Sequence, residues 1–419
     1  MSFITDKILD EGIDYDSVSI PPAYSKIKCE EVDISTHFSR RLGLELPFVL
    51  EVNNFQNIQL LELVSQQGGI GILGSNLDIS TRLEYIRTLK KDKGKYSCKL
   101  SCVYEDTELE HIIKLVEKLP NSRIAVIDKD KTFKYFIDAL GVASLSNKER
   151  PSKIEALPQK YTLEASVVKT NFSETQFKSA LEKSAFIAVA DDDTGNIKGY
   201  TSLAILDKYE KYPLASRSAD GSLLIASKVT PTNDITRKIG LLSEAGVDAV
   251  VIEYEHPHSK WVLEELKHLK LDFSDLEILV ENVSTSAGAT DILLTGVDGI
   301  VVGDNTKNAS RKIGVGLPLP SAIYGAFKAT KHSDISLLLS GGLTNEGNIV
   351  KSLATGVDAL WLNSIVNNAD KCDADFLLKE MERISLNIKK GICYSGCDNL
   401  KSFKQNKFIL HAGTSLLKA

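Results

Sequence analysis

The chain has 419 residues, of which 43% are hydrophobic and 25% are charged, with a net charge of −6 at pH 7. This composition is typical of a globular protein with one large core and a smaller module, and a negative balance gives no electrostatic case for binding nucleic acid or a membrane surface. No run approaches the roughly 18 apolar residues of a membrane span, and the acidic start MSFITDKILDEGIDYD does not resemble a signal peptide. We therefore expect a cytoplasmic protein.

The cysteines give no metal-binding pattern. Six cysteines in so long a chain indicate reduced thiols. Cys98 and Cys102, and likewise Cys393 and Cys397, are spaced C-x3-C, but no histidine cluster accompanies either pair. The sequence predicts small buried thiols and no metal site.

The first predicted structural unit lies in LLELVSQQGGIGILGSN. An amphipathic helix ends at Gly68 and Gly69, which permit a tight turn into the strand Ile70–Leu73. We expect these glycines to serve packing rather than ligand binding.

Two units of similar design follow between Ser97 and Lys211. Each has a helix, a short strand, a polar turn (DKDK or DDDTGN), and then another strand and helix. The predicted helices and strands are Leu109–Leu119 with Arg123–Ile127, and Ser173–Ser184 with Ala185–Ala190.

From Arg237 to Ile365 the chain alternates helices with continuous apolar strands of four to six residues, several of them reached through A-G-V-D or T-G-V-D turns. Such strands are typical of parallel sheets buried on both faces, and a series of them most simply closes into a (β/α)8 TIM barrel. The predicted strands are Ala249–Ile252, Leu276–Val280, Gly299–Val302, Ile335–Leu339 and Ala359–Leu362. We expect barrel halves at 1–96 and 212–419 and an insert at 97–211.

Several motifs resemble the IMP dehydrogenase / GMP reductase family: PPAYS near the start, GGIGILGSN, and KKGICYSGC near the end. The resemblance implies that the insert is a degenerate tandem of cystathionine-β-synthase-type (CBS) domains, which in the family regulate the barrel. CBS repeats often bind nucleotides through an Asp that bonds the ribose, but the corresponding positions here are Ile205 and Gly141. A nucleotide-binding module and a packing or dimerisation module both remain open.

The resemblance also implies a chemistry that this sequence lacks the groups to perform. Family members add a cysteine thiolate to C2 of the purine and pass hydride to NAD. The corresponding loop is GDNTKNASRKIGVG, with Asn308 or Ala309 near the cysteine position, and no cysteine occurs between Cys102 and Cys372. We therefore predict no catalytic residue.

The nucleotide positions implied by the resemblance have changed as well. Ser340 replaces the ribose-binding Asp, although Gly341 and Gly342 persist, and Asn363 with Ser364 replaces the phosphate-binding Gly-Ser pair. These five residues form the predicted residual site for a nucleotide or anion. Glu51 and Asn53 occupy the segment that lies under the base in the family, where a carboxylate would repel a phosphate.

On the dinucleotide side, Glu253 replaces an Asp, Tyr254 is expected to add bulk, and Asn282 persists. The family's long flap after LWLNSI is reduced. The loop Glu255–His258 could hold a metal or an acid–base pair, but a solvated loop is the simpler interpretation.

The favoured hypothesis is a non-catalytic regulatory or scaffold paralogue with no cofactor. It would form a homo-oligomer (a tetramer) or a mixed oligomer with an active homologue, and would bind a nucleotide or anion weakly at most. The alternative is an active purine-nucleotide oxidoreductase that uses NAD, or altered chemistry on the same barrel.

Overall fold

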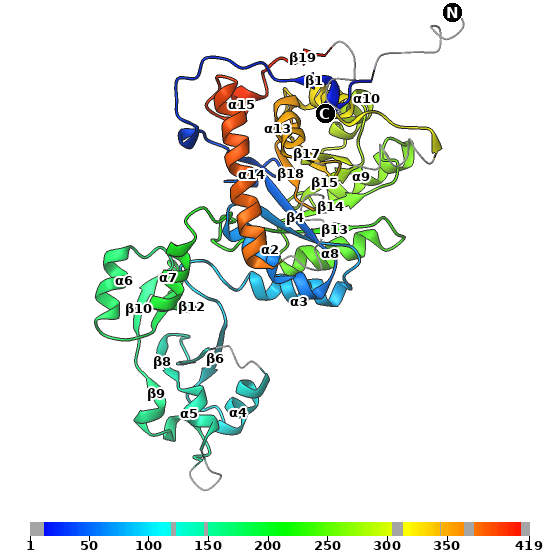
Figure 1. Cartoon of the computed structure of the whole chain (residues 1–419). Coiled ribbons are helices and arrows are strands. Elements are labelled where there is room, and N and C mark those ends of the chain that lie inside the picture. The colour runs from blue at the N-terminus through cyan, green and yellow to red at the C-terminus, as the bar shows by residue number, and fades with distance from the viewer. Residues whose placement is uncertain are drawn as a thin grey trace, which may run out of the picture. The chain divides into compact units, whose positions relative to one another are not determined.

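The computed structural model describes residues 12–118, 123–145, 150–303, 313–343, 345–363 and 373–411 (Figure 1). The chain divides into two compact units. Unit 1 comprises Met1–Arg87, Leu214–Ser218 and Leu224–Ala419, and unit 2 comprises Thr88–Pro213 and Ala219–Leu223.

Unit 1 is a closed barrel of eight parallel strands, which confirms the predicted (β/α)8 barrel. Its strand order is β13-β14-β15-β16-β17-β18-β4-β5. The strands are β4 (Phe48–Val52), β5 (Ile70–Leu73), β13 (Ile225–Val229), β14 (Ala249–Glu253), β15 (Glu277–Glu281), β16 (Gly299–Gly303), β17 (Ser336–Ser340) and β18 (Ala359–Trp361). The predicted strand ends differ from these by one residue at most, and Leu362 lies just beyond β18.

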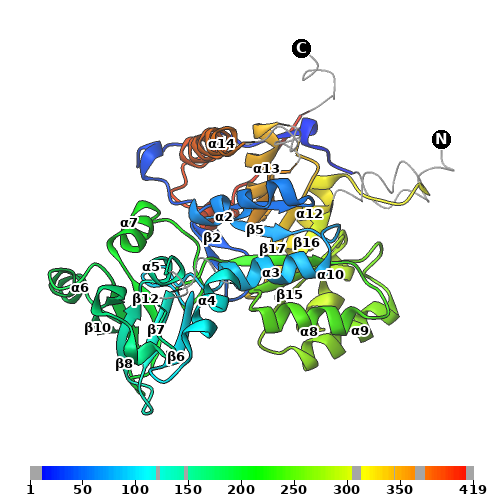
Figure 2. The ribbon, with the colours of Figure 1, turned by 90° about the horizontal axis from the view of Figure 1, so that it is seen from below.

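Helices surround the barrel (Figure 2). They are α2 (Gln59–Gln66), α3 (Ile79–Leu89), α8 (Ile235–Ala245), α9 (Lys260–Asp272), α10 (Ser286–Leu293), α12 (Leu319–Thr330), α13 (Glu346–Thr355), α14 (Ala374–Tyr394) and α15 (Leu400–Phe403). Near the chain ends, the short strand β1 (Val18–Ser19) pairs antiparallel with β19 (Ile409–Leu410).

The repeated G-V-D turns have a structural purpose. Each turn places an aspartate just before a strand, where its carboxylate accepts a hydrogen bond from a backbone N–H of the preceding strand in the barrel. Asp248 accepts from Ile225 at 2.7 Å, and Asp358 accepts from Leu337 at 2.8 Å. Asp298 likewise accepts from Ile278, at 3.0 Å, in the strand that begins at Glu277. The motif therefore fixes strand register at the N-terminal end of the barrel.

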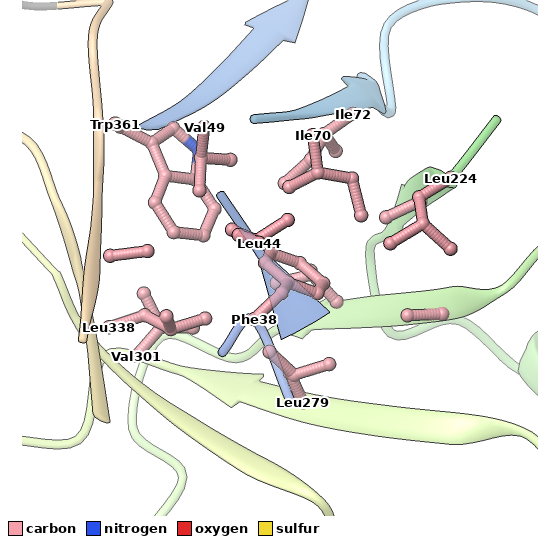
Figure 3. Packing of buried hydrophobic residues seen from close by; sticks show 14 residues of the cluster. Phe38, Leu44, Val49, Ile70, Ile72, Leu224, Leu279, Val301, Leu338 and Trp361 are labelled. Carbon is pink, nitrogen blue, oxygen red and sulfur yellow. The ribbon is translucent and has the colours of Figure 1, made fainter. Parts of the chain in front are cut away.

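The N-terminal end of the barrel is closed by a hairpin of β2 (Thr36–His37) and β3 (Gly43–Leu44). Phe38 from this hairpin is fully buried among core residues that include Leu279 and Trp361 (Figure 3). Arg41 fixes the hairpin, because its Nε donates to the buried carboxylate of Glu277 at 2.6 Å. A filled interior leaves the opposite end, where the strands finish, as the place for a site.

Unit 2 contains two copies of the order strand–helix–strand–strand–helix, and in each copy the second strand pairs parallel with the first and antiparallel with the third. The first copy is β6 (Leu100–Tyr104), α4 (Leu109–Lys118), β7 (Arg123–Ile127), β8 (Phe133–Ile137) and α5 (Ala139–Ala143), with β9 (Thr162–Leu163) beside β8. The second is β10 (Ser166–Lys169), α6 (Glu174–Leu181), β11 (Ile187–Ala190), β12 (Ile197–Thr201) and α7 (Leu203–Lys211).

The two copies share an aromatic contact surface. The guanidinium of Arg123 lies 3.7 Å from the ring centroid of Phe186, and the rings of Phe136 and Tyr200 are 6.3 Å apart. Cation–π and edge-to-face contacts of this kind stabilise the packing of one sheet on the other.

Candidate functional site

Charged side chains gather where the barrel strands end. Glu51 is next to last in β4, Lys228 is next to last in β13, and Glu253 and Glu281 end β14 and β15. Because parallel strands bring their C-terminal ends to one rim, residues far apart in sequence meet there. We call these four residues the Lys228 cluster.

The ammonium group of Lys228 lies at the centre of the cluster. Its Nζ is 2.8 Å from a carboxylate oxygen of Glu51, 2.9 Å from one of Glu281, and 3.9 Å from one of Glu253. The side chains of Lys228 and Glu281 are 7% and 5% exposed and that of Glu51 is 11% exposed, whereas Glu253 is 38% exposed. One buried cation is thus shared by two buried carboxylates, with a third at the solvent side.

This arrangement determines the protonation of the lysine. Burial alone would lower the pKa of Lys228, but the carboxylates of Glu281 and Glu51 more than offset burial, so the pKa is raised above its ordinary value. Lys228 therefore stays a protonated ammonium at neutral pH. A protonated amine has no lone pair, so Lys228 cannot act there as a nucleophile, a Schiff-base former or a general base.

The outermost carboxylate behaves differently. Burial raises the pKa of Glu253; Lys228 opposes this, whereas Glu281 and Glu51 add to it, and the net shift is upward. The fold thus disfavours the ionised form of Glu253.

Neighbouring groups hold the buried carboxylates in place. Asn53 Nδ2 donates to Glu51 at 2.9 Å, and the indole N–H of Trp361 donates to the same carboxylate at 3.3 Å. The hydroxyl of Ser340 donates to Glu281. Each donor compensates part of the desolvation of a buried charge.

A buried arginine holds the backbone at Lys228 by hydrogen bonds. Arg82 of α3 is 5% exposed, and its Nη1 donates to the backbone carbonyl of Lys228 at 2.7 Å and to Ser227 Oγ at 3.2 Å. Burial lowers the pKa of Arg82, with nearby Asp78 opposing the shift. Arg82 therefore fixes the backbone from which the Lys228 side chain extends.

The predicted nucleotide residues are occupied by contacts within the protein. Ser340 donates to Glu281, as described above. The side chain of Asn363 accepts from the backbone N–H of Glu51 at 3.0 Å and donates to the carbonyl of the same residue at 2.6 Å. Gly341 and Gly342 adopt left-handed conformations with φ of 84° and 72°. Asn363 thus acts as a clamp between two strand ends.

Three further predicted positions, Asn308, Ala309 and Ser364, lie outside the described residues. What was expected of the loop that contains Asn308 and Ala309 therefore stays a prediction.

The dinucleotide side differs from the expectation at one residue. Tyr254 was expected to add bulk to the site, but its side chain is 2% exposed and its hydroxyl donates to Glu265 of α9 at 2.5 Å. That prediction was wrong, because the ring packs into the shell between strand and helix. Asn282 has a positive φ of 70° and donates to the carbonyl of Tyr254 at 2.7 Å, so it links adjacent strand ends. Glu253, as described above, faces Lys228.

The loop Glu255–His258 contributes one exposed pair, His258 with Asp291 at 2.8 Å. Within the described ranges, no three His, Cys, Asp or Glu residues are placed so that they could hold a metal ion. Within the same ranges, no helix is long and apolar enough to cross a membrane.

Lys228 and Arg82 were not predicted from the sequence. One signal was available for Lys228: a lysine inside the apolar strand IASKV is unusual, because a lysine is almost never fully buried unless it is paired. Arg82 lies in an otherwise ordinary amphipathic helix and gave no such signal.

Comparison with known proteins identifies the barrel. Residues 12–386 match the family described as the IMP dehydrogenase / GMP reductase domain. The chain belongs to this family. Inosine-5'-monophosphate dehydrogenase of Aquifex aeolicus is 27% identical over 377 residues, which cover 88% of this chain and 76% of that protein. The corresponding enzyme of Halalkalibacterium halodurans is 25% identical, covering 86% and 74%.

Solved structures of GMP reductase from Trypanosoma brucei share the fold. The structure in complex with guanosine 5'-triphosphate has a TM-score of 0.77 and 21% identity, covering 98% of this chain and 100% of that one. A second, with guanosine 5'-monophosphate, has a TM-score of 0.77 and 19% identity, covering 98% of each chain. This member of the family therefore has the common fold at low sequence identity.

Proposed function

We propose that this chain is a non-catalytic member of the IMP dehydrogenase / GMP reductase family that acts as a regulatory or scaffold subunit. The observation that carries the proposal is the Lys228 cluster, which places a buried ion-pair network at the C-terminal ends of the barrel strands. The cluster uses the strand-end positions at which a barrel enzyme presents its catalytic groups.

Charge and hydrogen bonding both disfavour a nucleotide in this mouth. A phosphate would approach Glu51 and Glu281, and one ammonium cannot neutralise two buried carboxylates and an incoming dianion together. The polar groups of Ser340 and Asn363 already make hydrogen bonds to Glu281 and Glu51, respectively. A ligand would have to replace these contacts before it gained any of its own.

The residues on the dinucleotide side do not fit NAD either. The Asn282 side chain is held by the carbonyl of Tyr254, and Glu253 faces Lys228. The absence of cysteine between Cys102 and Cys372 removes the family's nucleophile from the whole middle of the chain. NAD would be a cofactor of this chain only if the family activity persists in another form.

We further propose that the repeated strand–helix–strand–strand–helix unit is a degenerate CBS tandem that serves packing or dimerisation. The proposed assembly is a homo-oligomer (a tetramer), or a mixed one with an active homologue, in the cytoplasm. Light scattering of the purified protein tests the first version, and co-purification with an active family member tests the second.

The deciding experiment measures turnover and binding side by side. We expect no NAD reduction with IMP and no NADPH oxidation with GMP above a no-enzyme control, while an active family member is positive in the same assays. Calorimetry is expected to detect no IMP binding at micromolar concentrations. Turnover with either substrate pair would overturn the proposal and favour the alternative, an active purine-nucleotide oxidoreductase.

A further inference from the structure

The segment before the barrel lies along the last long helix. The backbone N–H of Ala23 donates to the carbonyl of Tyr394, at the end of α14, at 2.8 Å. Lys389 Nζ contacts the carbonyl of Glu30 at 3.3 Å. The short 3-10 helix Cys29–Glu31, which contains Glu30, packs against α14. Two stretches from near opposite ends of the sequence are therefore neighbours.

Each stretch contributes a cysteine to this contact. Cys393 is 4% exposed, and its Sγ lies 3.4 Å from Ser25 Oγ and 3.5 Å from the carbonyl of Ile27. Cys29 begins the 3-10 helix that packs against α14, and its thiol neighbours that of Cys393. Cys29 is partly exposed, so a small oxidant can reach one member of the pair while the other lies buried behind it.

We propose that Cys29 and Cys393 are an oxidisable pair that closes into a disulfide and staples the N-terminal segment to α14. A disulfide requires the two chain segments to lie side by side, and here Cys393 Sγ lies 3.5 Å from the carbonyl of Ile27, two residues before Cys29, while the helix that begins at Cys29 packs against α14. The site is unrelated to the barrel mouth and does not depend on the proposed function.

The oxidant is a hydroperoxide, and the chemistry proceeds in two steps. The Cys29 thiolate attacks the peroxide oxygen, which breaks the O–O bond, forms a sulfenic acid and releases an alcohol, or water if the oxidant is hydrogen peroxide. The Cys393 sulfur then attacks the Cys29 sulfur, forms the S–S bond and expels water. The two thiols lose two electrons and two protons, which the peroxide takes up.

The surroundings of Cys29 set the rate of this reaction. The hydrogen bond to Cys393, together with burial, raises the pKa of Cys29, so little thiolate is present at neutral pH. The pair should therefore react slowly near pH 7 and faster as the pH rises.

The test uses the full-length protein treated with hydrogen peroxide. We expect intact-mass spectrometry to show the loss of two hydrogen atoms, thermal unfolding to shift upward, and a reductant to reverse both changes. Digestion after Lys and Arg should give a linked pair of peptides, CEEVDISTHFSR with GICYSGCDNLK. The second peptide contains both Cys393 and Cys397, so the linked pair alone does not identify the cysteine. The Cys397→Ser variant resolves this, because the link between Cys29 and Cys393 should still form in it.

Matched variants separate the outcomes. Cys29→Ser and Cys393→Ser should each abolish the loss of two hydrogens, whereas Cys102→Ser, which removes an exposed thiol elsewhere, should leave it unchanged. The proposal is overturned if Cys29→Ser still forms the disulfide. It is also overturned if Cys29 only gains oxygen atoms without a linked peptide, or if the link joins Cys393 to Cys397.

Discussion

Replacing Lys228 with methionine tests whether the Lys228 cluster is a buried, mutually dependent network. Methionine keeps the length and apolar stem of lysine but removes its charge. In the wild-type protein the ammonium faces two carboxylates at 2.8 and 2.9 Å. At an effective permittivity of about 20, each attraction is about 6 kcal/mol before the desolvation of the charges is subtracted.

The net cost of the substitution follows from what remains. Removing one partner of a buried ion pair costs about 3–5 kcal/mol, because an uncompensated charge stays buried. In the variant, a proton bound to Glu51 or Glu281 would neutralise the uncompensated charge. Protonating a carboxyl group of ordinary acidity at pH 7 costs about 3.7 kcal/mol, so this route limits the loss but does not remove it. We therefore expect Lys228→Met to lower the free energy of unfolding by about 3–5 kcal/mol at pH 7.

The pH dependence gives the network a signature. The raised pKa of Lys228 means that its contribution is fully present below its ordinary value of 10.5 and is lost only at higher pH, so the lysine stays charged between pH 5 and 7. In the variant, each carboxyl group that binds a proton does so about 1.4 kcal/mol more easily per unit fall in pH. The deficit of Lys228→Met should shrink accordingly from pH 7 to pH 5.

Urea unfolding followed by tryptophan fluorescence measures this deficit. Both tryptophans, Trp261 and Trp361, belong to unit 1, so the signal reports the barrel alone. The control is Lys260→Met in α9 of unit 1, which removes a pair with Glu264 whose side chains are 90% and 60% exposed and should leave the free energy of unfolding nearly unchanged. Adding Glu51→Gln and Glu281→Gln to Lys228→Met should recover most of the loss.

The reasoning is refuted by either of two results. A Lys228→Met protein within about 1 kcal/mol of wild type at pH 7 would show that the ammonium does not compensate buried charge. A deficit that stays constant between pH 7 and pH 5 would show that the remaining carboxylates are not the source of the cost.

Two further substitutions probe the rim of the cluster. Because the pKa of Glu253 is raised, its ionised form opposes folding at neutral pH; Glu253→Gln should raise the thermal midpoint at pH 7, with an advantage that shrinks as the pH falls toward 4.5. Equal midpoints at pH 7 would contradict this. Ser340→Asp replaces a donor with a second carboxylate beside Glu281, so it should destabilise the barrel by about 1–3 kcal/mol and leave IMP binding undetectable by calorimetry. Tight IMP binding by Ser340→Asp would show that the cluster is no obstacle.

The barrel could be predicted because its determinants are local. Apolar strands and G-V-D turns repeat along the chain, and the turn aspartates such as Asp248 bind the neighbouring strand in a way that each repeat encodes by itself. The helix–strand–strand–helix order predicted for each half of the insert is found in unit 2, but the strands that begin each copy, β6 and β10, were not predicted.

The site could be predicted only in part, because its contacts join residues distant in sequence. Glu51 was interpreted as a charge that repels phosphate, but the sequence could not show that it pairs with Lys228, which arrives from a strand beyond the insert. Asn282 and Asn363 were recognised as positions but not as clamps, because their partners are backbone groups of other strand ends. The residue types indicated that the C-terminal ends of the strands are polar. Which of these polar groups pair by hydrogen bonds and ion pairs is determined only when the barrel closes.

The energetics of the cluster bear on where the protein can act. A ligand whose binding separated Lys228 from Glu51 or Glu281, at a cost of about 3–5 kcal/mol, would lose roughly two to nearly four orders of magnitude in apparent affinity. The same network stabilises the folded barrel only while no ligand disturbs it, so it favours a structural use of the mouth over a catalytic one. Interactions of this chain with other molecules are therefore expected on its outer surfaces, where binding leaves the Lys228 cluster intact.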